Sequence, residues 1–63
     1  MRVEAQDLAR TLFALYLAHD RTISNELRDE IASVEIISSN ESEVVAALVE
    51  LHDLIADERR RRH

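Results

Sequence analysis

Length, composition and charge restrict this chain to a narrow set of structures. It has 63 residues, carries a net charge of −5, and contains no Cys, Gly or Pro. A chain of this length forms one domain that buries only about 60% of its unfolded surface, so its stability alone is marginal, and small domains usually add disulfides, a metal or oligomerisation. Without cysteine, disulfides and most zinc sites are excluded, and without glycine there are no phosphate-cradling loops. We therefore expect a single domain over residues 1–63 that oligomerises.

The first predicted helix covers residues 3–19. Its apolar residues recur at helical spacing and form two adjacent stripes, which together cover more than half of the helix circumference. A surface helix needs an apolar face of roughly 100°, so this helix has more apolar surface than one neighbour can cover. The stripes consist of Leu8, Leu12 and Leu15, and of Ala9, Phe13 and Tyr16, with Leu17 beside them.

The second predicted helix covers residues 23–37, with Thr22 as its expected N-cap. Its apolar stripe is narrow. The segment at residues 34–37 is β-branched, which favours a strand. Because a single strand would have nothing to pair with, we expect this segment to continue the helix. The stripe consists of Ile23, Leu27, Ile31 and Val34.

The third predicted helix covers residues 41–60 and follows a polar link at residues 38–40. Asn40 and Glu43 resemble a capping box, with Asn in place of the usual Ser or Thr. Four apolar residues have the spacing of a coiled-coil seam, and further apolar residues, Leu54 among them, lie beside it. The seam residues are Val44, Leu48, Leu51 and Ile55.

These patterns predict an all-α fold of three short helices, in which two wide-faced apolar helices flank a narrower amphipathic one. Because the wide faces exceed what one chain can cover, we expect a homodimer to complete the helical bundle. Tyr16 is the expected anchor, since tyrosine is enriched at interface hot spots. The predicted dimer or partner interface consists of Leu8, Leu12, Phe13, Leu15, Tyr16, Leu17, Leu48, Leu51, Leu54 and Ile55.

Charge is divided unevenly along the chain. All thirteen acidic residues but only four of the eight arginines lie in residues 1–58, which gives this segment a net charge of −9. The Arg-rich end at residues 59–63 predicts a polyanion contact through Arg59, Arg60, Arg61 and Arg62. The alternative is that these arginines complement the helix dipole and form i,i+4 pairs, Asp57 with Arg61 and Glu58 with Arg62. The acidic body would repel nucleic acid, so we favour the alternative.

Catalytic and metal chemistry find little support in the sequence. His19, His52 and His63 lack the helical spacing of metal ligands, and most serines lie at predicted helix boundaries, where capping explains them. We therefore expect a non-enzymatic protein without cofactor or metal. The longest apolar run, residues 12–18, is too short to span a bilayer, so we expect a cytoplasmic protein with no membrane contact.

Together these features predict a homodimeric protein interaction module, with a regulatory, adaptor or inhibitor role. It would bind an unidentified target protein through apolar helix surface rimmed by acidic residues. Its length and predicted helical dimer are typical of small phage and mobile-element regulators as a type, although no motif supports a specific family. Two alternatives remain: a nucleic-acid-associated regulator that uses the arginine arms of a dimer, and a structural subunit of a larger assembly.

Overall fold

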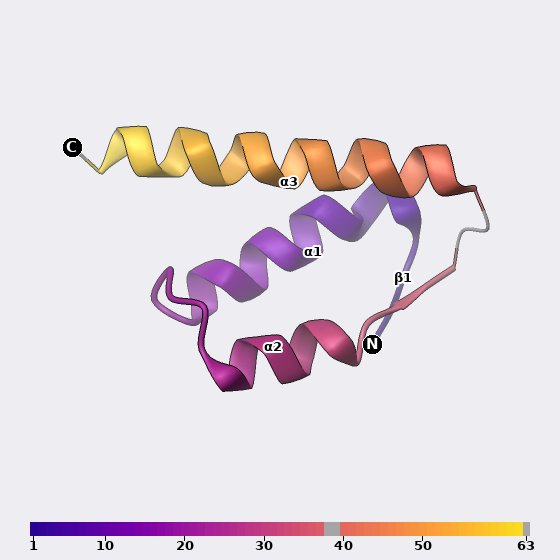
Figure 1. The fold of residues 1–63 in the computed structure, drawn as a ribbon, viewed down its shortest axis with the longest axis horizontal. Coiled ribbons are helices and arrows are strands. Elements are labelled where there is room, and N and C mark those ends of the chain that lie inside the picture. The colour runs from indigo at the N-terminus through magenta and orange to yellow at the C-terminus, as the bar shows by residue number, and fades with distance from the viewer. Residues whose placement is uncertain (38–39, 63) are drawn as a thin grey trace.

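The computed structural model describes residues 1–37 and 40–62, and over these residues it has three helices and one short sheet (Figure 1). The predicted three-helix architecture is confirmed. Ser38 and Ser39 of the predicted link, and His63 of the Arg-rich end, lie outside the described residues. The elements, in chain order, are β1 Arg2–Val3, α1 Ala5–Ala18, α2 Asn25–Ala32, β2 Glu35–Ile36 and α3 Glu41–Arg61.

Helix α1 lies between α2 and α3 and contacts both of them (Figure 1). The tight α1–α2 link reverses the chain, so α2 runs antiparallel to α1. Strand β2 follows α2, and α3 then runs in the same direction as α1 (Figure 1). The longest helix, α3, packs beside α1.

The core lies mainly between α1 and α3. Its buried cluster consists of Leu8, Ala9 and Leu12 from α1 and Ala47 from α3. The distance between packed helices depends on the side chains at their contact, so the alanines favour a close approach. Half-buried apolar side chains surround this cluster, namely Val3, Leu15, Val34, Val44, Leu51 and Leu54.

The prediction of helix through residue 37 was wrong, because this segment does have a partner strand. Strand β2 pairs in parallel with β1, with Arg2 opposite Glu35 and Val3 opposite Ile36. The Glu35 amide donates to the Met1 carbonyl (2.6 Å), and the Ile37 amide donates to the Val3 carbonyl (2.9 Å). Residue 3 was predicted to begin the first helix, but α1 begins at Ala5. Local sequence could not show that the N-terminus supplies the missing strand.

Helix α2 is shorter than predicted at its start. Ser24, and not Thr22, is the N-cap, and its hydroxyl accepts a hydrogen bond from the Leu27 amide (3.1 Å). The expected stripe is divided as a result: Leu27 is the fully buried anchor of α2, whereas Ile23 and Ile31 are exposed. One side chain therefore accounts for most of the docking of α2.

The link between α1 and α2 turns through two left-handed residues, Asp20 (φ 53°) and Arg21 (φ 59°). The Arg21 amide donates to the Tyr16 carbonyl (3.0 Å), and the Asp20 amide donates to the Leu17 carbonyl (3.2 Å). This is the hydrogen-bond pattern of a Schellman motif, which usually has glycine at its left-handed position. The motif ends α1 and directs Arg21 towards α3, where its side chain pairs with Glu58.

Leu27→Ala should lower the free energy of unfolding by about 2–4 kcal/mol, because it leaves a cavity beneath α2. Leu27 is 1% exposed. The matched control is Ile23→Ala, at a side chain that is 64% exposed, and it should change stability by about 0.5 kcal/mol or less. Urea denaturation followed by circular dichroism, at equal protein concentration, measures both. Equal losses would show that Leu27 does not anchor α2.

Candidate protein interaction site

One side of α3 faces α1. Val44, Leu51 and Leu54 pack against the buried cluster that includes Ala47. Together with Ala47 they follow one another at intervals of three, four and three, which is the spacing of residues on a single helix stripe. Glu58 continues this stripe, and its carboxylate is largely buried where it meets Arg21. This inward stripe accounts for the contact of α3 with its own chain.

A second side of α3 is apolar and uncovered. Val45, Leu48 and Val49 are 53%, 47% and 58% exposed. His52 lies one helical turn beyond Leu48 and is also exposed. The coiled-coil seam predicted from the sequence is therefore wrong in one respect, because it mixes two stripes. Val44 and Leu51 face α1, whereas Leu48 faces away and Ile55 is half-buried between the two sides.

The predicted interface residues of α1 lie mostly inside the chain. Leu8, Leu12 and Tyr16 are buried, whereas Leu17 is exposed. Phe13 and Leu15 are half-buried, and the Phe13 ring stacks on Tyr16 with centroids 6.5 Å apart. In this conformation a partner reaches Leu17 directly, but it finds Leu8, Leu12 and Tyr16 covered by the chain itself.

The molecule is thin for its size, with extents of 38, 22 and 12 Å along its principal axes. Viewed down the shortest axis, the three helices lie side by side in one layer, with α1 between α2 and α3 (Figure 1). Its accessible surface is 4781 Å², whereas a compact monomer of this mass exposes about 4,200 Å². A single layer of helices thus leaves about 600 Å² of extra surface uncovered.

An acidic groove of about 540 Å³ lies between the start of α1 and the first half of α3. Glu4, Glu43 and Glu50 line it together with small side chains and Ile37. The neighbouring segment is apolar, because Ile36 and Ile37 are exposed beside β2. Exposed isoleucines next to carboxylates resemble the acid-rimmed apolar surface that the sequence predicts.

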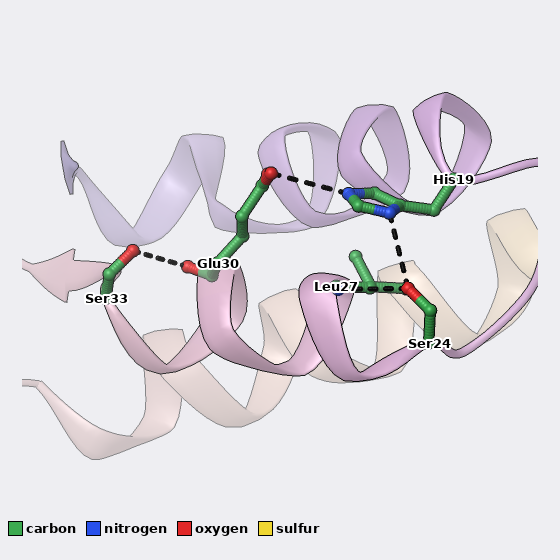
Figure 2. A network of polar contacts seen from close by, with 5 residues as sticks. All are labelled: His19, Ser24, Leu27, Glu30 and Ser33. Carbon is green, nitrogen blue, oxygen red and sulfur yellow. Dashed lines mark hydrogen bonds and ion pairs between the residues drawn. The ribbon is translucent and has the colours of Figure 1, made fainter.

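The polar contacts between α1 and α2 hold these two helices together (Figure 2). The His19 ring reaches Glu30 through Nε2 (3.4 Å) and Ser24 through Nδ1 (3.4 Å). Ser24 also caps α2, and the Ser33 hydroxyl closes its other end by donating to the Glu30 carbonyl (2.7 Å). His19 and Ser24 therefore have a structural role, because their side chains connect the end of α1 to α2.

Contacts at the start of α2 also shift the pKa of the Glu26 carboxyl. A hydrogen bond from its own backbone, and then one involving the Ser24 side chain, lowers the pKa of the Glu26 carboxyl below its ordinary 4.5. His19 adds a smaller attraction. A carboxylate in the first turn also interacts favourably with the helix dipole. The shift therefore reflects the start of α2 and needs no catalytic explanation.

The Arg-rich end is partly engaged with neighbouring acids. Arg60 and Arg61 each lie 3.3 Å from an Asp57 carboxylate oxygen, so the predicted pairing of Asp57 with Arg61 is confirmed. Glu58 pairs with Arg21 from the α1–α2 link and not with the predicted Arg62. Arg59 and Arg62 are exposed at the end of α3.

Within residues 1–37 and 40–62, no group of three acidic, histidine or cysteine residues could hold a metal ion. Across the same part of the chain, no helix is long and apolar enough to cross a membrane. No protein-family model matches the chain, and no curated protein or solved structure is significantly similar to it.

Glu26→Gln should flatten the loss of stability in acid. A carboxyl whose pKa is lowered by folding stabilises the folded state above its unfolded pKa, here 4.5, and this stabilisation is lost as the pH falls through the folded-state pKa. The variant lacks that contribution at neutral pH and should lose less stability below pH 4.5. Asp29→Asn removes the same charge from the same helix and is the control. If wild type and Glu26→Gln lost the same stability as the pH falls, folding would not lower the pKa of Glu26.

Arg21→Met should destabilise the fold by about 1–3 kcal/mol, because it leaves a largely buried carboxylate without its partner. One Glu58 oxygen already has no hydrogen bond within the described chain. Glu58→Gln removes the buried charge and keeps an acceptor, so it should cost about 1 kcal/mol or less. Chemical denaturation compares the two. Equal losses in the two variants would show that the ion pair itself, and not the unpaired carboxylate, accounts for the effect.

Proposed function

We propose that this protein is a homodimeric protein interaction module that acts on a target protein as a regulator, adaptor or inhibitor. The observation that supports the proposal best is the uncovered apolar surface. Only seven apolar residues are buried among the described ones, whereas nine large apolar side chains are exposed. Soluble proteins seldom expose large contiguous apolar patches unless these serve as interaction sites.

Dimerisation fits the thin shape of the chain. Domains are built from at least two packed layers of secondary structure, and this chain supplies little more than one. A second copy would add the missing layer. The excess surface of about 600 Å² is close to the roughly 800 Å² that each partner buries in a standard protein interface.

A target protein would bind elsewhere on the surface, beside β2. Ile36 and Ile37 are exposed there, and the adjacent groove carries three carboxylates. Apolar contacts would supply the affinity, and the carboxylates would favour a target with a basic rim. This arrangement suits an adaptor or an inhibitor of a basic protein.

A nucleic-acid-associated role has weaker support. Asp57 pairs with two of the four terminal arginines, which reduces the positive charge available to phosphates. Two of the other four arginines also pair with acids, Arg2 with Glu35 and Arg21 with Glu58, whereas binding to a duplex requires a basic face. A structural subunit of a larger assembly would use the same apolar surfaces.

The solution mass of the protein tests the dimer. Light scattering over a wide concentration range, with helicity followed on the same samples, should show a dimer that loses helicity only when dilution dissociates it. A monomer should not remain fully helical, because its single layer of helices leaves apolar surface uncovered. A well-folded monomer at every concentration would overturn the proposed homodimer.

A further inference from the structure

We infer that two copies of this chain pair through antiparallel α3 helices, along a stripe formed by Glu41, Val45, Leu48, His52, Ile55 and Arg59. The inference rests on the proposed homodimer and adds its interface and orientation. This outward stripe is distinct from the inward one that packs on α1. A second copy is the occupant because the stripe is complementary to itself.

The stripe has the spacing of a coiled-coil seam. Its residues follow one another at intervals of four, three, four, three and four, which keeps them on one line along the helix. Val45 and Leu48 are exposed, as are Glu41 and Arg59 at the two ends, and Ile55 is half-buried. Such a line of apolar side chains along one helix normally lies against a second helix.

The order of residues along the stripe selects the antiparallel orientation. If a two-fold axis passes beside residue 50, Glu41 lies opposite the partner's Arg59 and Val45 lies opposite the partner's Ile55. Leu48 then lies opposite the partner's His52. Each of these pairings occurs twice, as a symmetric two-fold interface requires. The same register places acid against base at both ends of an apolar centre.

A parallel pair would lack these complements. It would place Glu41 against the partner's Glu41 and Arg59 against the partner's Arg59, so like charges would face each other at both ends. Like-charge juxtaposition is strongly unfavourable across an interface. Antiparallel helices also bring the negative end of each dipole to the positive end of the other.

His52 sits at the middle of the stripe, where a purely apolar seam would have an aliphatic side chain. Its side chain is 83% exposed in the single chain, and Nδ1 lies 3.7 Å from an Asp53 carboxylate oxygen. A polar residue at one core position of a coiled coil specifies register at a cost in stability. Opposite Leu48, His52 would fix the register in this way.

The experiment reverses the charges at the ends of the stripe in the full chain. Glu41→Arg and Arg59→Glu, made singly, should each weaken dimerisation about tenfold or more, because each places two like-charge pairs in the dimer. The double variant restores opposite charges and should dimerise within about threefold of wild type. Sedimentation equilibrium measures the dissociation constants, and circular dichroism at high concentration verifies that each variant is folded. Asp29→Arg, exposed on α2 and off the stripe, is the charge control and should leave the dimer intact.

A cross-linking measurement establishes the orientation independently of charge. The chain has no cysteine of its own. Under mild oxidation, a mixture of Val45→Cys and Ile55→Cys should form the mixed disulfide dimer in preference to either self-linked dimer. Preferential self-linking would establish a parallel pair and overturn the inference.

The failures are distinguishable from one another. A wild-type chain that stays monomeric would overturn the proposed homodimer together with this inference. A wild-type dimer that keeps its affinity in both single charge variants, or is not restored in the double variant, would overturn only the antiparallel α3 interface. Dimerisation would then use another apolar surface, such as the one beside β2.

Discussion

The packing of α1 against α3 is the contact on which the rest of the structure depends. Leu8, Ala9 and Leu12 meet Ala47 there, and most of the half-buried apolar side chains surround this cluster. The remaining elements attach to this pair of helices: α2 through Leu27, and the N-terminal strand through its pairing with β2. A core this small cannot also cover the outer side of α3, since 63 residues provide too few elements to enclose three helices.

This constraint divides α3 into three sides. One packs on α1, a second is apolar and exposed, and a third carries acidic residues that include Glu50, Asp53 and Asp57. A net charge on such a side opposes non-specific association through exposed apolar surface. The proposed dimer places the apolar side against its own copy, and the surface beside β2 remains open to a target.

The number of helices and the wide apolar faces of α1 and α3 followed from periodicity alone, because both are local properties of the sequence. Two other predictions failed for want of long-range information. Residues 35–36 form a strand because residues 2–3 supply a partner more than thirty positions away. Glu58 meets Arg21 because the left-handed turn at Asp20 and Arg21 directs that side chain across to α3. Neither pairing follows from neighbouring residues.

For the candidate interface, the amino-acid sequence by itself determined that α1 and α3 have more apolar surface than one neighbour can cover. It also determined that acidic residues precede basic ones along α3. The apolar faces and the order of charges both follow directly from the order of residues. Only the tertiary structure decided which side of α3 faces inward. Spacing alone assigns four residues of α3 to a single seam, namely Val44, Leu48, Leu51 and Ile55. The approach of α1 partly covers Val44 and Leu51 and leaves Leu48 exposed, because a helix can turn only one side towards its neighbour.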